Sequence, residues 1–150
     1  MKNPGDSPPA SSGLGMSDAE ERLTARPCRI HREDTSRSFG TPSVSMIVPA
    51  FNAERYIGFT IESLLRQTHT DLEIIVVDDG STDRTHEIAC RYATEDSRIT
   101  VLTQRNAGVA TARNRAIDVA KGEFLGFVDA DDIWHPTAVA KMLARFEGAS

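Results

Sequence analysis

Residues 72–81 read LEIIVVDDGS, an apolar run that stops at two aspartates, a glycine and a serine. A continuous run of this length, rich in β-branched residues, is typical of a strand that is buried on both faces. The residues that follow are typical of a turn, and their side chains can cap a following helix. The stretch therefore predicts a parallel strand that lies between two layers of helices and ends in a polar turn.

The same alternation continues on both sides of this stretch. Further apolar runs lie at residues 44–48, which Pro49 is expected to end, and at 99–102 and 124–128. Apolar residues recur with helical spacing in four other segments, which predicts helices over residues 54–67, 83–93, 109–120 and from Pro136 to the end of the chain. Strand and helix alternate four times, so we expect an α/β fold with a mainly parallel, doubly wound, Rossmann-like sheet.

Composition separates a tail from a folded domain. Residues 1–41 are rich in proline, serine, glycine and charge and lack apolar periodicity, which predicts a disordered tail before a domain at 42–150. The charges of the tail cancel, so the net charge of −5 belongs to the domain, and an acidic domain is a poor nucleic-acid binder. The sequence shows no secretory signal and no transmembrane segment, which predicts a cytoplasmic protein.

Three polar loops follow predicted strands. Right-handed crossovers bring the carboxyl ends of parallel strands to one edge, which is where ligands bind in such sheets. The loops expected at this edge are Pro49-Ala50-Phe51-Asn52, Asp78-Asp79-Gly80-Ser81 and Asp129-Ala130-Asp131-Asp132.

The third loop is strongly acidic. Crowded carboxylates repel one another unless a cation or a proton lies among them. Hard oxygen ligands with an open side suit Mg²⁺ or Mn²⁺, which commonly complete their shells with water and substrate phosphate. Asp129, Asp131 and Asp132 therefore indicate a metal site, and the alternative is a solvated acidic turn.

Other residues of this edge also allow two interpretations. Asp79 could accept hydrogen bonds from a base or ribose, or it could serve the turn, and Phe51 could stack on a base or close the core. Gly108 would let backbone approach a ligand ahead of a helix N-terminus that favours phosphate, with Arg113 near the edge. The alternative for this pair is a plain turn and a surface arginine.

Taken together, these segments resemble a family 2 glycosyltransferase with a GT-A fold. The resemblance covers about residues 43–147, and its segments stand in the family's order and at its spacing. They are VSMIVPAFN at 44–52, SLLRQT at 63–68, EIIVVDDGSTD at 73–83, NAGVATARN at 106–114 and GEFLGFVDADD at 122–132.

The resemblance implies a nucleotide-diphosphate-sugar donor, commonly a UDP-sugar, and a glycan, lipid or other hydroxyl compound as acceptor. It implies inversion at the anomeric carbon, with Mn²⁺ or Mg²⁺ bound by Asp131 and Asp129. The residues it assigns to the donor site are Pro49, Phe51, Asn52, Asp79, which would hydrogen-bond the base, Gly108, Arg113, Asp129 and Ala130.

The sequence departs from the family after the acidic loop. The family's catalytic base normally lies well past this loop, so no residue here is assigned that role. We expect an incomplete GT-A domain, truncated after the fourth strand and its helix, whose open sheet edge favours self-association. Many relatives build cell-wall or other cell-surface polysaccharide at the inner membrane face, so any peripheral membrane contact would be through the substrate.

Three other classes of protein share some of these features. A non-catalytic nucleotide-sugar-binding module, inactive alone or completed by another chain, is the main alternative. A phosphorylatable receiver domain expects its acidic pair after the first strand, whereas this chain has it after the second. A dinucleotide-binding oxidoreductase expects Gly-x-Gly-x-x-Gly after a strand, and this pattern is absent from the sequence.

Overall fold

The computed structural model describes residues 42–148, and the expectation of a disordered tail over residues 1–41 lies outside them. Four strands of this region form one parallel sheet in the order β3-β2-β1-β4. The strands are β1 (Val44–Ala50), β2 (Leu72–Asp78), β3 (Ile99–Thr103) and β4 (Phe124–Phe127). The helices are α1 (Ile57–Leu65), α2 (Thr85–Glu95), α3 (Val109–Ile117) and α4 (Ala138–Glu147). The predicted parallel α/β fold is therefore confirmed.

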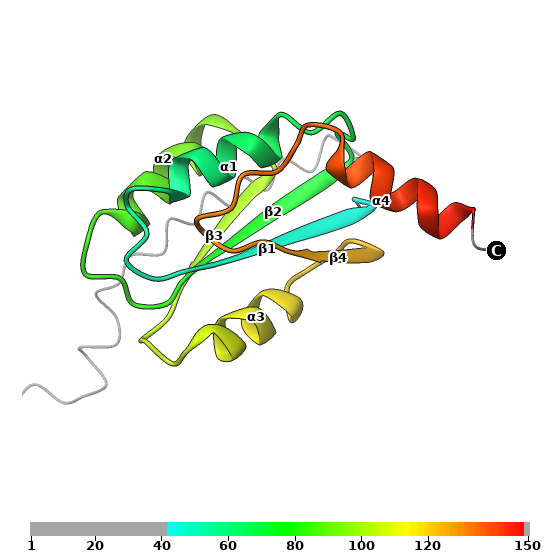
Figure 1. The fold of residues 1–150 in the computed structure, drawn as a ribbon. Coiled ribbons are helices and arrows are strands. Elements are labelled where there is room, and N and C mark those ends of the chain that lie inside the picture. The colour runs from blue at the N-terminus through cyan, green and yellow to red at the C-terminus, as the bar shows by residue number, and fades with distance from the viewer. Residues whose placement is uncertain (1–41, 149–150) are drawn as a thin grey trace, which may run out of the picture.

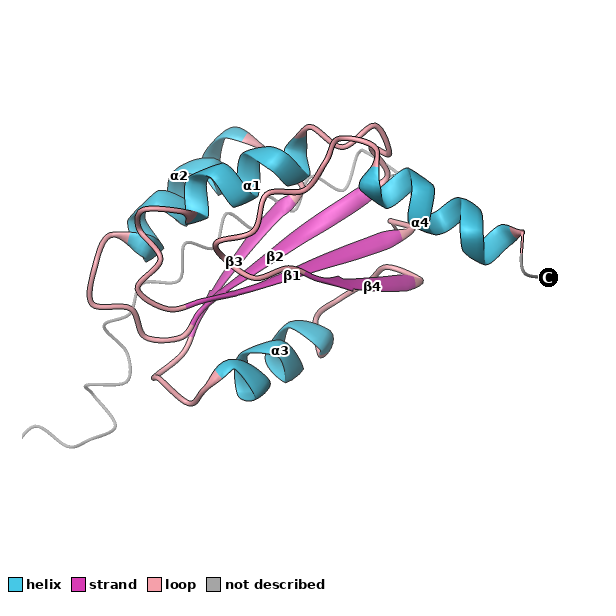
Figure 2. Ribbon diagram, in the orientation of Figure 1, coloured by secondary structure: helices cyan, strands magenta, loops and turns pink. Residues whose placement is uncertain are grey.

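Helices cover both faces of the sheet, as Figures 1 and 2 show. Helices α1 and α2 lie on one face and α3 lies on the other, while α4 lies near the amino ends of β1 and β4. The larger core fills the α1 and α2 side and includes Val139 of α4. A smaller core on the opposite face joins Ile47, Ile75 and Val77 of the strands to Ala112 and Ala116 of α3. The doubly wound arrangement follows from this pair of cores.

Pro49 does not end the first strand, contrary to the prediction. Strand β1 continues to Ala50, and Pro49 pairs in register with Val77 of β2. The carbonyl of Ile47 accepts from the N–H of Val128, just after β4, and the carbonyl of Ala50 accepts from the N–H of Asp79, just after β2. Because alternate residues of a strand face opposite neighbours, the backbone of Pro49 faces the β4 side. The last β1–β4 pair is at Ile47, and the missing N–H of Pro49 therefore costs the sheet no hydrogen bond.

The first helix begins three residues later than predicted, at Ile57. The segment before it forms a loop that is fastened to the start of α2. The N–H of Ala53 donates to the Thr85 hydroxyl at 2.8 Å, and the N–H of Arg84 donates to the Glu54 carboxylate at 3.1 Å. These bonds give the N–H groups of Ala53 and Arg84 side-chain partners, and they hold the loop at the carboxyl edge of the sheet.

Strand β4 forms one edge of the described sheet. Its side chains alternate in burial, and Leu125 and Phe127 are both more than two-fifths exposed. Self-association through this edge stays a prediction. No helix within residues 42–148 is long and apolar enough to cross a membrane.

Candidate functional site

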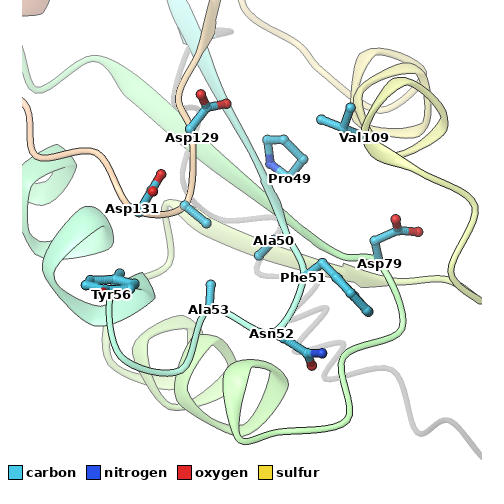
Figure 3. Close-up of a pocket in the computed structure, with 11 residues that line it drawn as sticks. Pro49, Ala50, Phe51, Asn52, Ala53, Tyr56, Asp79, Val109, Asp129 and Asp131 are labelled. Carbon is cyan, nitrogen blue, oxygen red and sulfur yellow. The ribbon is translucent and has the colours of Figure 1, made fainter.

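A cavity of about 360 Å³ opens at the carboxyl edge of the sheet (Figure 3). Seven of the predicted site residues line it: Pro49, Phe51, Asn52, Asp79, Asp129, Ala130 and Asp131. They come from the ends of β1 and β2 and from the loop after β4. The parallel topology thus brings together residues that are up to 82 positions apart in the sequence (49 to 131).

Two predicted site residues are not among those that line the cavity. Gly108 and Arg113 contact lining residues instead, through Asp79 and Asp129 respectively. Sequence reasoning missed four others that line it, which are Ala50, Ala53, Tyr56 and Val109. Three of these are near neighbours of Phe51 and Asn52 in the sequence, and the fourth follows Gly108. Their positions beside predicted site residues could therefore have indicated that they line the cavity.

The end of β1 forms one wall of the cavity. Phe51 is 51% exposed, so its ring does not close the core and is available to a ligand. Asn52 has a left-handed backbone conformation with φ of 48°, which asparagine tolerates better than most residues. Its side-chain oxygen accepts from the N–H of Thr82 at 2.9 Å, and its own N–H donates to the Ser81 hydroxyl at 3.0 Å. Asn52 therefore joins the first two loops of the edge.

Asp79 is buried and fastens the second loop to the segment before α3. Its Oδ1 accepts from the Gln104 amide and the N–H of Ala107, both at 2.8 Å, and its Oδ2 accepts from the N–H of Gly108 at 2.9 Å. Burial raises the pKa of Asp79, but these hydrogen bonds outweigh it and hold the pKa below its ordinary value. Three of roughly four acceptor positions of the carboxylate are thus occupied, which leaves one for a ligand.

Glycines allow these loops to approach one another. Gly80 has φ of +73°, and a Cβ there would lie 2.7 Å from the backbone nitrogen of Asn106. Gly108 has φ of +90° just before α3, but a Cβ there would meet nothing within 4 Å. Gly80 is therefore required for both space and conformation, and Gly108 for conformation alone.

Arg113 reaches the acidic loop from α3. One terminal nitrogen of its guanidinium donates to Oδ1 of Asp129 at 3.1 Å, and its charged centre lies 5.6 Å from the centroid of the Phe127 ring. Its Nε is buried and has no hydrogen-bond partner among residues 42–148. The ion pair is part-exposed, so it orients Arg113 at the cavity's edge more than it stabilises the fold.

The acidic loop supplies the carboxylates of the cavity. Asp129 and Asp131 are exposed and lie on one side of the cavity, across from Asp79 (Figure 3). Asp132 is not among the lining residues, and its N–H donates to the carbonyl of Asp129 at 3.0 Å, which closes the turn. The described residues contain no group of three or more metal-binding side chains arranged to hold an ion. Asp129 and Asp131 both line the cavity, and hard carboxylate oxygens of this kind suit a Mg²⁺-like ion that shares its ligands with water and substrate.

The charge of the cavity sets a condition on its ligand. Within the described chain, the lining residues include three aspartates and no lysine or arginine, and Arg113 stands beside them. An anionic ligand would be repelled by this lining unless a cation accompanied it. The cavity is therefore suited either to a cationic ligand or to an anionic ligand bound together with a metal ion.

The fold and the acidic cavity together define an α/β domain with a cavity at the carboxyl ends of its parallel strands. The sequence model of glycosyl transferase family 2 matches residues 45–149, and the chain belongs to that family.

Individual relatives agree with this assignment. The chain is 54% identical over 91 residues to the uncharacterized glycosyltransferase EpsJ of Bacillus subtilis (strain 168), which covers 61% of this chain and 26% of the relative. It is similar to the crystal structure of S. aureus TarS 1–349 in complex with UDP, with a TM-score of 0.65 and 35% identity over 71% of this chain and 32% of that one. It is also similar to the mannosyltransferase PcManGT from Pyrobaculum calidifontis in complex with GDP-Man and Mn²⁺, with a TM-score of 0.64 and 30% identity over 69% of this chain and 32% of that one. The chain thus spans about a quarter to a third of the length of these relatives.

Proposed function

We propose that this domain binds a nucleotide-diphosphate sugar and takes part in transferring the sugar to an acceptor hydroxyl. Support comes above all from the cavity, in which seven residues of the family's segments meet at the carboxyl edge of the sheet. The UDP bound to TarS and the GDP-Man bound to PcManGT support a nucleotide sugar as ligand. We favour a UDP-sugar donor, following the resemblance of the sequence to the family.

Each wall of the cavity receives a part of the donor in this proposal. Pro49, Phe51 and Asn52 line the nucleotide pocket, where the exposed ring of Phe51 is free to stack on the base. Asp79 accepts a hydrogen bond from the base through its remaining acceptor position. Asp129 and Ala130 adjoin the ribose and diphosphate.

Two further residues act from the α3 side. Gly108 places backbone at the N-terminus of α3, a position that favours phosphate. Arg113 lies beside Asp129 at the cavity's edge and supplies positive charge to the same diphosphate.

Asp129 and Asp131 would hold a divalent cation, Mn²⁺ or Mg²⁺. Their hard oxygen atoms and the acidic lining support this assignment, as does the Mn²⁺ present with GDP-Man in PcManGT. When bound, such an ion neutralises charge on the departing diphosphate.

The transfer we propose is a direct displacement that inverts the anomeric carbon. The bond from the anomeric carbon to the diphosphate oxygen breaks as the bond to the acceptor oxygen forms, and a carboxylate takes the acceptor's proton. We assign no residue of this chain as that base. The cavity's part is to orient the donor and to stabilise the leaving group.

The proposed acceptor follows from family resemblance alone. We propose a glycan, a lipid or another hydroxyl compound, with the reaction on the cytoplasmic side and any membrane contact made through the substrate. A purely non-catalytic binding module is not favoured, because the family and the relatives are glycosyltransferases.

Isothermal titration with UDP and GDP, each with and without Mn²⁺ or Mg²⁺, tests the proposal. We expect metal-dependent binding, and we expect Asp131→Asn to weaken it by at least about tenfold, because loss of supporting groups alone costs that much at metal sites. Asp132→Asn is the matched control. It removes the same charge from the neighbouring residue, whose side chain does not line the cavity. Absence of heat with every nucleotide and metal, or equal losses in the two variants, would overturn the proposed site.

A further inference from the structure

We propose that three buried polar side chains, Thr60 and Ser63 of α1 and Gln67 just after this helix, position the acidic loop and so tune its affinity for the metal and the nucleotide. Thr60 and Ser63 lie three positions apart on one face of α1, and Gln67 follows beyond the end of the helix at Leu65. All three are at most 7% exposed, although none of them lines the cavity. The inference concerns positioning of the proposed metal loop and rests on the function proposed above.

Thr60 holds the loop at its acidic part. Its hydroxyl donates to the carbonyl of Ala130 at 2.8 Å, across 70 positions of sequence. Ala130 lies between the two aspartates that are proposed to hold the metal. The hydrogen bond therefore fixes the backbone between those two carboxylates relative to α1.

Ser63 and Gln67 hold the rest of the loop. The Ser63 hydroxyl donates to the Thr60 carbonyl at 2.8 Å and accepts from the N–H of Trp134 at 3.1 Å. The Gln67 amide donates to the carbonyl of His135 at 2.9 Å and accepts from the N–H of Val139 at 3.1 Å. The segment from the acidic residues to the start of α4 is thus tied at successive points to α1 and to the residues that directly follow it.

These contacts explain why three polar side chains are buried at α1 and just after it. The loop crosses the α1 side of the sheet (Figure 1), and the backbone groups of Ala130, Trp134 and His135 meet the three side chains in part-buried hydrogen bonds. Buried peptide groups need hydrogen-bond partners, and buried hydroxyl and amide groups are costly without them. The backbone groups of the loop and the three polar side chains become hydrogen-bond partners of one another only if the loop takes this path. The three side chains therefore select the path of the loop.

Helix α1 also connects the acidic loop to the part of the cavity proposed to bind the nucleotide. Helix α1 follows directly from the loop of Phe51, Asn52 and Ala53, which lines the cavity. A loop anchored to α1 therefore keeps a fixed position relative to the nucleotide pocket. Because metal and ligand sites need their groups placed to within about half an ångström, a loosened loop loses affinity even when the domain stays folded.

Thr60→Val tests the inference in the full chain, because valine keeps the shape of threonine and removes the hydroxyl. We expect the dissociation constant for Mn²⁺ with UDP to rise by roughly three- to tenfold, the effect of losing about one buried hydrogen bond. Thr60→Ser keeps the hydroxyl and should restore most of the affinity. Hydrogen exchange of the metal-free chain should show faster exchange at the Asp132 amide in Thr60→Val, with the β2 amides unchanged.

Tyr92→Phe is the control for a purely structural effect. It removes a hydrogen bond of 2.7 Å from the Tyr92 hydroxyl to Glu62, on another face of α1. We expect it to lower the melting temperature without changing the metal and nucleotide affinity. Gln67→Met, which frees the end of the loop near α4, should lower the melting temperature more and the affinity less than Thr60→Val.

The outcomes separate the inference from the proposed function. If wild-type protein binds Mn²⁺ and UDP and Thr60→Val binds them equally well, the positioning role is wrong and the proposed function stands. If the wild-type protein binds neither, the proposed function and the affinity role built on it both fail. Unchanged exchange at Asp132 in Thr60→Val would overturn the anchoring of the loop independently of any ligand.

Discussion

Replacing Asp79 by asparagine should destabilise the domain more than a single charge change at its surface. The carboxylate is buried and accepts three hydrogen bonds, from Gln104, Ala107 and Gly108. Asparagine keeps the shape but offers one acceptor oxygen in place of two. If that oxygen faces Gln104 and Ala107, the new amide group points its hydrogens at the N–H of Gly108.

The size of the effect follows from these contacts. A hydrogen bond to an ionised group contributes about 1.5–3 kcal/mol, and an unsatisfied buried donor costs about 1–3 kcal/mol. Asp79→Asn loses one of these hydrogen bonds outright, and in the other two the acceptor becomes an uncharged amide oxygen. We therefore expect the free energy of unfolding at pH 7 to fall by about 2–4 kcal/mol.

The loss of unfolding free energy in Asp79→Asn should also depend on pH, and it should become smaller as the pH falls. The folded chain holds the pKa of Asp79 below its ordinary value of 3.8. The stability that the carboxylate adds is fully present above that ordinary value and is lost as the pH falls through the lower pKa of the folded state. Asparagine does not titrate, so the gap between wild type and Asp79→Asn should narrow below about pH 4.

Urea denaturation of wild type and Asp79→Asn at several pH values measures both quantities. Glu123→Gln is the control, because it neutralises an exposed carboxylate and should change the unfolding free energy by less than about 0.5 kcal/mol. A loss below about 1 kcal/mol for Asp79→Asn at pH 7, or a gap that widens as the pH falls, would refute this account of Asp79.

Two further predictions concern backbone packing and the charge of the site. Gly122→Ala should lower the unfolding free energy by about 3 kcal/mol, because its Cβ would lie 2.4 Å from the backbone nitrogen of Ser45. Gly126→Ala, whose Cβ would meet only a flexible methionine side chain, should cost less than about 1.5 kcal/mol, and urea denaturation that ranks them the other way would contradict this reading. Arg113→Gln removes the ion pair with Asp129, and should strengthen binding of Mn²⁺ alone while weakening binding of UDP with Mn²⁺, each by about two- to fivefold. Titrations in which both affinities move in the same direction would show that Arg113 does not divide its charge between the acidic loop and the diphosphate.

The positions of the predicted site residues could be read from the sequence to a large extent. Continuous apolar runs such as residues 72–77 are explained only by strands covered on both faces, and alternation with helices then fixes a parallel sheet. Parallel strands end at one edge, so Asp79, Asp129 and Asp131 had to meet there. The structure brings them to one cavity for this topological reason.

The exact ends of the elements could not be read in the same way. Pro49 looked like a stop because it lacks an N–H, but whether that N–H is needed depends on where β4 ends beside it. The start of α1 likewise depends on hydrogen bonds to residues about 30 positions away, at Asp83 and Thr85. Local propensity does not contain either of these contacts.

Period, run length and motif order are local properties of the chain, and they were enough to predict a parallel α/β domain similar to family 2 glycosyltransferases and the loops that meet at its edge. How the polar side chains are divided between cavity lining and scaffold depends on tertiary contacts. Asp79 and Asn52 join loops as well as lining the cavity, whereas the buried side chains of Thr60 and Gln67 hold the acidic loop and the residues that follow it. These assignments depend on hydrogen bonds between segments up to 70 positions apart, and such pairings become visible only when the chain is folded.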